Sequence, residues 1–351
     1  MMIRLIQQSA IALSIAYSCY LVSHSLIAEA AVVTLPDGGR CEGEISNGQL
    51  NGKAVCEYGN GDRYEGNFVS GNKEGTGTYA FADKNRYTGE FKDNQIQGKG
   101  VWEYADGDRY EGEFSNGQPN GTGIYIRAGG GRYEGQFKDG MPNGTGTYTF
   151  PNGDKCSGSV ANGQINGTGN CIYANGNRYE GALSNNQPNG KGVYTFANNG
   201  TYTGEFSNGQ FNGAGVREYP NGNRYEGTFR NGKPHGQGTF AIAQQGTYKG
   251  EFNDGQFSGK GVFSFANGNR YEGEFRDGKF NGSGVYIFTN GDRCEGQFTD
   301  GNLNGRGTCK YANGDNYEGE FKNGNKHGQG TYIYKDGTRL QGNWQDNQFQ
   351  S

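Results

Sequence analysis

The residues best able to do covalent chemistry in this sequence are its cysteines. Six of the seven form three pairs, each separated by fifteen residues: Cys41 and Cys56, Cys156 and Cys171, Cys294 and Cys309. Two thiols can form a disulfide, or they can supply half of a four-ligand zinc site. No histidine lies near any pair, which disfavours the metal. The outcome depends on how the chain positions the members of each pair.

The chain is an array of 23-residue repeats without insertion or deletion. Thirteen complete repeats begin at residues 41, 64, 87, 110, 133, 156, 179, 202, 225, 248, 271, 294 and 317, and a truncated copy begins at Leu340. Glycine fills the third and twelfth positions of every repeat and the fourteenth of all but one, which has Ala54. With 67 glycines and 32% hydrophobic residues the chain has little aliphatic material for a core, but a disordered tract would not keep this register.

Each repeat has the pattern of a β-hairpin. In the repeat 110–132, alternation places Tyr110, Gly112 and Phe114 on one face of a strand. NGQPNG then reads as the turn and TGIYI as the second strand, and most repeats end in Asn-Gly or Asp-Gly, which reverses the chain again. The prediction is an all-β fold, an elongated antiparallel β-meander ribbon of thirteen hairpins with a half-repeat at each end.

Folding the hairpin at its turn sets the third position opposite the fourteenth and the first opposite the sixteenth. Glycine then faces glycine, and Tyr and Phe rings can lie over the bare backbone in place of an aliphatic core. In the repeats with paired cysteines, the facing first and sixteenth positions are both cysteine. We therefore predict disulfides Cys41–Cys56, Cys156–Cys171 and Cys294–Cys309, each worth roughly 3 kcal/mol in the chain-entropy model. A metal site and cysteine acting as a small hydrophobe remain the alternatives.

The N-terminus has the features of an export signal. Arg4 precedes an apolar stretch that ends in Ala28-Glu29-Ala30, which fits an A-x-A cleavage site after Ala30. The expected organisation is a signal peptide at 1–30, an N-terminal half-repeat at 31–40, the repeats at 41–339 and a C-terminal half-repeat at 340–351. Secretion or a periplasmic, cell-envelope location follows, and it agrees with disulfides. Retention of 9–27 as a membrane anchor is the alternative, and lipidation at Cys19 is a weaker one.

The pattern Y-E-G-E-F-x-N-G-x-x-x-G-x-G-x-Y-x-Y-x-N-G resembles the MORN repeat (membrane occupation and recognition nexus) over residues 41–351. The resemblance implies an antiparallel β-ribbon used for protein scaffolding, self-association and phospholipid contact. Some members carry a lipid kinase or methyltransferase domain, and none is expected here. The paired cysteines and the expected export are departures from the cytosolic members of the family. They weaken the analogy between this chain and members that act at the inner leaflet of a membrane.

Enzymatic chemistry is not expected from these repeats. The histidines after the signal, His235 and His327, both fall at the eleventh position, in KPHGQG and NKHGQG, and are read as solvated turn residues. No nucleophile and base, phosphate loop or metal-ligand cluster interrupts the periodicity, and a recurring GxG is structural. The sequence therefore predicts no catalytic residue, no cofactor and no metal, with calcium at the NGD and DGD turns as a minor alternative.

A stripe of basic residues at position 23 is the candidate surface site: Arg63, Arg86, Arg109, Arg132, Arg178, Arg224, Arg270 and Arg293, extended by Lys155 and Arg339. Glutamate commonly follows two residues later on the same strand face, so we expect the stripe to be neutralised internally. Cleavage would remove one base and one acid and leave the net charge of −4 unchanged. Nucleic acid is therefore not expected as a partner, and membrane lipid is not favoured.

The expected function is that of an exported, non-enzymatic repeat scaffold that mediates protein–protein interaction in the envelope or extracellular space. Its partner is a protein that the sequence does not identify, or a second copy of the chain. The alternative is a ribbon that binds phospholipid headgroups, or glycans through exposed tyrosine rings, at a membrane or cell surface.

Overall fold

The computed structural model describes residues 30–350, which consist of strands and turns without a helix. The chain divides into two compact units, residues 1–167 and 168–351. Residues 1–29 of the predicted signal peptide, with the alternative anchor at 9–27 and Cys19, lie outside the described residues, whereas Ala30 begins β1. Within the described residues there is no helix long and apolar enough to cross a bilayer.

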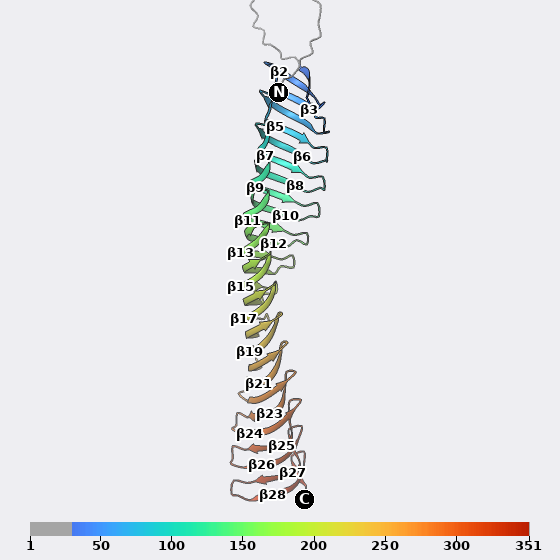
Figure 1. The fold of residues 1–351 in the computed structure, drawn as a ribbon. Helices are drawn as coiled ribbons and strands as arrows, with labels where there is room; N and C mark the ends of the chain where they lie inside the picture. Colours follow the sequence, from blue (N-terminus) through green and yellow to red (C-terminus); the bar gives the residue numbers. More distant parts are fainter. Residues whose placement is uncertain (1–29, 351) are drawn as a thin grey trace, which may run out of the picture. The chain divides into compact units, whose positions relative to one another are not determined.

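The first unit is an antiparallel meander in which each strand pairs with the next (Figure 1). Its strands are β1 (Ala30–Thr34), β2 (Arg40–Ser46), β3 (Gln49–Glu57), β4 (Arg63–Val69), β5 (Asn72–Ala80), β6 (Arg86–Lys92), β7 (Gln95–Glu103), β8 (Arg109–Ser115), β9 (Gln118–Ile126), β10 (Arg132–Lys138), β11 (Met141–Thr149) and β12 (Lys155–Ala161). β13 (Gln164–Ile172) contains the boundary between the units.

The second unit has the same organisation, with consecutive antiparallel pairs from β14 to β29. Its strands are β14 (Arg178–Ser184), β15 (Gln187–Thr195), β16 (Thr201–Ser207), β17 (Gln210–Glu218), β18 (Arg224–Arg230), β19 (Lys233–Ile242), β20 (Gly246–Asn253), β21 (Gln256–Phe265), β22 (Arg270–Arg276), β23 (Lys279–Ile287), β24 (Arg293–Thr299), β25 (Asn302–Lys310), β26 (Asn316–Lys322), β27 (Asn325–Ile333), β28 (Arg339–Gln345) and β29 (Gln348–Gln350). The predicted all-β meander of hairpin repeats is confirmed.

The hairpin β8–β9 shows the register of a repeat. Tyr110 pairs with Tyr125 and Gly112 with Gly123, as predicted. An irregularity between Gly112 and Phe114 then shifts the pairing by two residues, so that Phe114 pairs with Pro119. The prediction that all of NGQPNG is turn is wrong, because the two residues Asn116 and Gly117, with φ of 50° and 77°, complete a tight reversal, and β9 begins at Gln118.

A second, wider turn joins each hairpin to the next. Between β7 and β8, the Gly107 N–H donates to the Tyr104 carbonyl at 3.0 Å, and the Tyr104 N–H donates to the Asp108 carbonyl at 2.9 Å. Gly107 has φ of 93°, which glycine adopts without steric cost. This turn carries the ring of position 18 and the Asp or Asn of position 22, and so it positions the residues described below.

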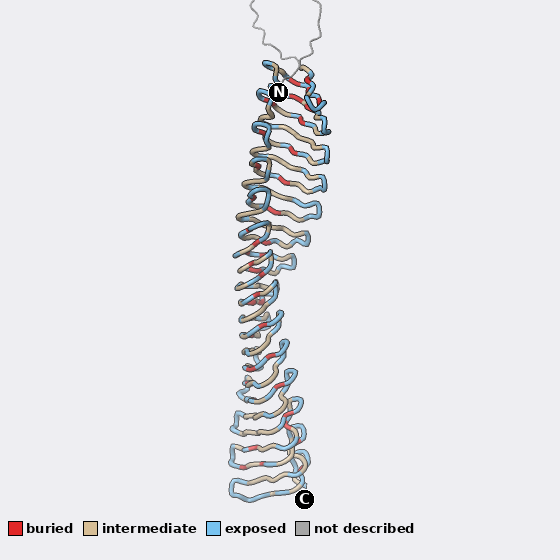
Figure 2. The backbone as a smooth tube through the Cα atoms, viewed as in Figure 1, coloured by how far each residue is buried: buried red, intermediate tan, exposed pale blue. Residues whose placement is uncertain are grey.

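The core is built from tyrosine rings lying on glycine backbone. Tyr202 is fully buried, and its hydroxyl donates to the Glu205 carbonyl at 2.8 Å. A Cβ on Gly204 or Gly215 would lie 2.6 Å from that hydroxyl, closer than real Cβ contacts allow. The rings of Phe206 and Phe229 meet Tyr202 edge-on at 5.1 and 4.9 Å. The predicted aromatic-on-glycine core is confirmed, and Figure 2 shows its buried residues recurring along the chain.

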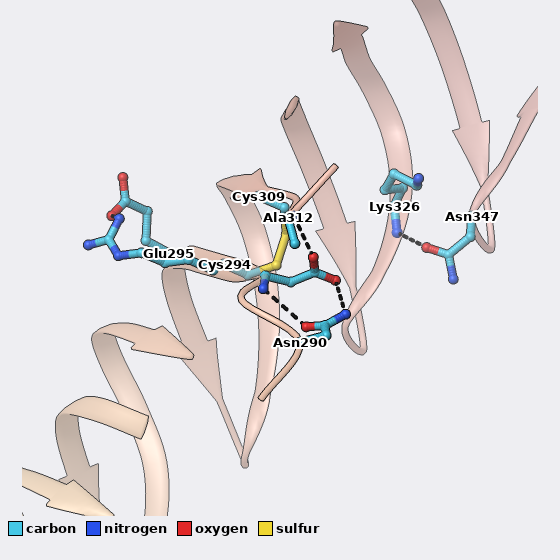
Figure 3. Close-up of a disulfide and its surroundings, with 9 residues drawn as sticks. Asn290, Cys294, Glu295, Cys309, Ala312, Lys326 and Asn347 are labelled. Carbon is cyan, nitrogen blue, oxygen red and sulfur yellow. Dashed lines mark hydrogen bonds and ion pairs between the residues drawn. A yellow bond between two sulfur atoms is a disulfide. The ribbon is translucent and has the colours of Figure 1, made fainter. Parts of the chain in front are cut away.

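Disulfides replace tyrosine in some repeats. Cys41 and Cys56 face each other across β2 and β3 and form a disulfide with a Cα separation of 4.0 Å. Cys294 and Cys309 do the same at 4.1 Å (Figure 3). Cys156 and Cys171 are disulfide-bonded cysteines as well. At the two ends of the described residues β1 pairs with β2, and β28 pairs with the short strand β29.

Candidate functional site: an aromatic ladder

The basic stripe lies on the face of the sheet opposite the buried tyrosines, and its arginines are paired with carboxylates. A guanidinium nitrogen of Arg109 lies 2.7 Å from a carboxylate oxygen of Glu111, and the same atoms of Arg132 and Glu134 are 2.6 Å apart. In each pair the glutamate stands two residues further along the same strand. The same pairing is formed by Arg63, Arg224, Arg270 and Arg293, whereas Arg86 lies 3.8 Å from Glu103 of the next strand. Arg178 begins β14 and is exposed. The expected neutralisation is therefore seen at seven of the eight arginines of the stripe.

A shallow hollow on this same polar face is also balanced in charge. The hollow between Gln237 and Gln297 has glycine backbone as its floor. Its charged wall residues are three bases, Lys249, Lys260 and Arg270, and three acids, Glu272, Glu274 and Glu295. Such a surface has no net field to attract an anionic ligand.

The two histidines lie in strands, not in turns as predicted. His235 belongs to β19 and His327 to β27, because the preceding Asn-Gly pair alone completes each reversal. Both are half-buried, and His327 Nδ1 lies 3.9 Å from an Asp346 carboxylate oxygen. Among residues 30–350, no three His, Cys, Asp or Glu side chains are grouped closely enough to hold a metal ion.

The opposite face carries rings that remain half-buried and contact one another from repeat to repeat. In the first unit these are Tyr58, Tyr79, Phe81, Trp102, Tyr104 and Tyr125, which we call the aromatic ladder. Their successive ring centroids are separated by 5.9, 4.5, 5.2, 5.9 and 6.0 Å. The ladder is a continuous apolar surface reached from solvent, in contrast to the fully buried tyrosines of the first position.

Aspartate at position 22 fixes the ladder between neighbouring repeats. Asp108 accepts a hydrogen bond from the Tyr125 hydroxyl and another, at 2.9 Å, from the Ala128 N–H of the next turn. The Tyr125 hydrogen bond is the main cause that holds the pKa of Asp108 below its usual range. Asp62 makes the equivalent bond to Tyr79 at 2.7 Å. The Tyr79 and Tyr125 rings of the ladder are thus oriented by hydrogen bonds before any partner arrives.

The same turn motif is seen in the second unit (Figure 3). There the Ala312 N–H donates to the carboxylate of Asp292 at 2.8 Å, and the Asp292 N–H donates to the Asn290 side chain at 3.0 Å. Where position 22 is asparagine, Asn177 and Asn269 donate to the hydroxyls of Tyr194 and Tyr286 instead. Aspartate and asparagine at position 22 therefore both connect one repeat to the next through hydrogen bonds.

Three cations of the chain lie over rings on this face. Lys73 Nζ is 5.2, 5.6 and 5.3 Å from the ring centroids of Tyr58, Tyr64 and Tyr79, and burial lowers the pKa of Lys73. The Lys326 ammonium lies over four rings of the second unit, at 4.8 to 5.6 Å. The Arg217 guanidinium lies over Phe196 at 4.4 Å. Sequence reasoning missed both the ladder and these cations, although Lys73 and Lys326 stand at a position where other repeats carry apolar residues.

The fold and site define a class of protein: an array of hairpin repeats with disulfides, neutralised polar stripes and a preformed aromatic surface. The family model of the MORN repeat matches thirteen consecutive segments, residues 41–63 to 317–339. The chain therefore belongs to the MORN-repeat family. Repeats of this family are non-enzymatic and bind proteins or lipids, so the protein is a repeat binding scaffold. No curated protein matches the chain.

Several solved structures match over long stretches at low identity. The SAS-4 (dCPAP) TCP domain of Drosophila melanogaster, in complex with a proline-rich motif of Ana2, is 13% identical, with 61% of this chain and 99% of that chain covered and a TM-score of 0.28. The TCP10 domain of Danio rerio CPAP with a STIL peptide is 10% identical, with 91% and 97% covered and a TM-score of 0.22. Virginiamycin B lyase from Staphylococcus aureus is 14% identical, with 86% and 88% covered and a TM-score of 0.13.

Proposed function

We propose that this chain is an exported, non-enzymatic scaffold that binds a partner protein through the aromatic ladder. The observation that supports this most is the ladder itself, in which six half-exposed rings lie in continuous contact along the first unit. Tyrosine and tryptophan dominate the energetics of protein interfaces, because they bury a large area at a low cost in conformational entropy. The hydrogen bonds from Tyr79 and Tyr125 to aspartate reduce that cost further.

Export is supported by the disulfides. Cysteine pairs such as Cys41–Cys56 persist in oxidising compartments and are rare where glutathione keeps thiols reduced. The proposal places the protein in the extracellular space, the periplasm or the cell envelope.

A lipid-binding role has less support, because seven of the eight arginines of the basic stripe lie beside glutamate. Arg109 and Arg132 are each within 2.7 Å of a carboxylate, so a phosphate headgroup would have to displace an existing partner. Glycan stacking on the tyrosine rings uses the same surface as the proposed protein partner, and the experiment must separate the two.

The test is site-specific photo-crosslinking in the cells that produce the protein. A benzophenone amino acid replaces Tyr104 on the ladder or, as a matched control, Ile126, which lies on the opposite face of the adjacent hairpin strand and is 37% exposed. The proposal expects a discrete protein adduct from position 104 and none from position 126. Equal adducts from both positions, or retention of the chain on polysaccharide with no protein adduct, would refute it.

A further inference from the structure

Three repeats surround their tenth position with the same four residues. Each has tyrosine at the eighteenth position of the preceding repeat, at its own first position and at its own sixteenth position, and aspartate at the twenty-second position of the preceding repeat. These are the repeats that begin at residues 64, 110 and 317. Their strand register is also the same, since residue 10 pairs with the phenylalanine of position 5 in each: Phe68 with Lys73, Phe114 with Pro119, Phe321 with Lys326.

In two of these repeats the four residues enclose a lysine of the chain. Lys73 Nζ lies within 5.6 Å of three tyrosine ring centroids, and the neighbouring Asp62 carboxylate favours its charged form. Lys326 Nζ lies 4.8 Å from the ring centroid of Tyr332, whose hydroxyl donates to Asp315 at 2.7 Å. The negative faces of the rings attract a cation at these distances. The protein therefore shows twice that this arrangement accommodates a primary ammonium group.

In the third repeat the same arrangement has proline in place of the lysine. The rings and the carboxylate of the two filled cages correspond here to Tyr104, Tyr110, Tyr125 and Asp108. Pro119 occupies the tenth position. Within the described part of the chain, the cations found over aromatic rings are Lys73, Arg217 and Lys326, so none belongs to this repeat. We call Tyr104, Tyr110, Tyr125 and Asp108 the vacant cage.

Two of the three rings of the vacant cage are half-accessible while Tyr110 is fully buried, and the ring geometry differs from that of the cage that holds Lys73. Tyr104 and Tyr125 are half-buried, as is Asp108. The centroids of Tyr104 and Tyr125 are 6.0 Å apart, close to the 5.9 Å between Tyr58 and Tyr79. Their interplanar angle is 68°, against 22° for the pair beside Lys73. The two rings are thus almost equally far apart in the two cages. They are nearly parallel in the cage that holds Lys73 and steeply inclined in the vacant cage.

We infer that the vacant cage binds the ammonium group of a lysine side chain presented by the partner protein. This inference rests on the proposed function and specifies what the ladder recognises. The two filled cages provide the precedent for a primary ammonium on an alkyl chain. Asp108 supplies the opposite charge, and its carboxylate, which already accepts from Tyr125 and Ala128, retains lone pairs for a further N–H donor. The exposed Arg127 also acts on Asp108 electrostatically and competes with the partner's lysine for it.

The test uses the purified full chain with tyrosine rings labelled with carbon-13 for NMR. The probe is N-acetyl-lysine amide, and its control is N-acetyl-norleucine amide, which has the same chain length without the charge. We expect saturable shifts of the Tyr104 and Tyr125 ring signals with the lysine probe alone. Pro119→Lys should abolish them, because the introduced side chain fills the cage, whereas Pro142→Lys in the next repeat should not.

A second set of variants separates recognition from folding. Asp108→Asn should weaken lysine binding about fivefold or more while the fold is kept, because asparagine occupies this position at Asn177 and Asn269. Lys73→Ala should open a second cage and produce new shifts at Tyr58 and Tyr79. Absence of shifts in both the native chain and Lys73→Ala overturns the inference. Equally tight binding of tetramethylammonium, which has no N–H to donate, overturns the assignment to lysine.

The inference and the proposed function fail separately. Ladder crosslinks to a protein without binding of the lysine probe would leave the scaffold proposal standing and reject the cage. Probe binding at Tyr104 and Tyr125 without any ladder crosslink would establish an ammonium site and reject the protein-binding ladder.

Discussion

The phenol ring of Tyr202 lies against the backbone of Gly215, so that a Cβ there would come within 2.6 Å of both the ring carbon Cε2 and the hydroxyl oxygen. This relationship recurs wherever tyrosine opens a repeat, and it replaces the aliphatic packing that the chain lacks. It accounts for the glycines of the third and fourteenth positions better than turn geometry does, because Gly215 sits in the middle of a strand without a positive φ.

The first prediction concerns this contact. Gly215→Ala should destabilise the protein by about 1–3 kcal/mol, the usual cost of overpacking a close-packed core. Gly129→Ala is the control, because a Cβ at Gly129 meets nothing within 4 Å. Urea unfolding of both variants measures the difference in free energy of unfolding. Equal stability of the two would contradict the tyrosine-on-glycine core.

The second prediction concerns alkaline pH. Burial raises the pKa of Tyr202 from 10.0 to about 12. A raised folded-state pKa contributes stability that is complete below the unfolded pKa and is lost as the pH rises through the folded pKa. The free energy of unfolding should therefore stay level to about pH 10 and fall between about pH 10 and 12. Phenolate absorbance and urea titrations over this range provide the measurement.

Tyr202→Phe separates ionisation from other alkaline effects. The variant loses the hydrogen bond to the Glu205 carbonyl, which should cost about 0.5–1.5 kcal/mol at neutral pH. Its free energy of unfolding should then fall less steeply than that of the native chain above pH 10. A slope identical to that of the native chain would show that buried phenols do not govern the alkaline transition.

The third prediction concerns lipid. The native chain should not sediment with anionic liposomes at physiological ionic strength, because seven of the eight arginines of the stripe lie beside glutamate. Changing Glu65, Glu111 and Glu134 to glutamine frees three arginines of the stripe and should produce binding that salt removes. Replacing Thr76, Thr122 and Thr145 on the same face by alanine is the control and should have no effect. Strong sedimentation of the native chain would favour the membrane alternative.

The fourth prediction concerns the disulfides. Replacing Cys294 and Cys309 together by serine should lower the free energy of unfolding by roughly 3 kcal/mol, the chain-entropy value for a loop of about fifteen residues. Mapping of peptides from the exported protein without reduction should recover all three predicted pairs and an N-terminus at Ala31. Free thiols at these positions, or an intact Met1, would contradict the export proposal.

Much of the hairpin could be predicted from the sequence because its determinants are local and repeated. The exact period aligned Tyr110 with Tyr125 and Gly112 with Gly123, and the structure has that register. Even the one exception has a structural explanation. Ala54 stands where other repeats have glycine, in a repeat whose first residue is Cys41, so no tyrosine ring lies over it.

The parts that could not be predicted depend on contacts between repeats. Lys73 meets a ring from its own repeat and one from the preceding repeat, Tyr79 and Tyr58, and no short motif links the three. The aspartates of position 22 looked like turn residues, whereas Asp108 also bonds the Tyr125 side chain seventeen residues away. The bulge after Gly112 was missed as well, since an Asn-Gly turn does not by itself specify the pairing that precedes it.

The most direct measurement of the central claim is the affinity for the protein that crosslinks to the ladder, compared between two matched double variants. Trp102→Ala with Tyr125→Ala removes two ladder rings, and Lys99→Ala with Thr122→Ala alters the opposite face of the same strands, β7 and β9. With folding of both verified by urea unfolding, the ladder variant should bind at least about thirtyfold more weakly, as for a single interface hot spot, and the control should bind normally. Full affinity in the ladder variant, together with a loss in the control, would show that the partner binds the polar face and that the account is wrong.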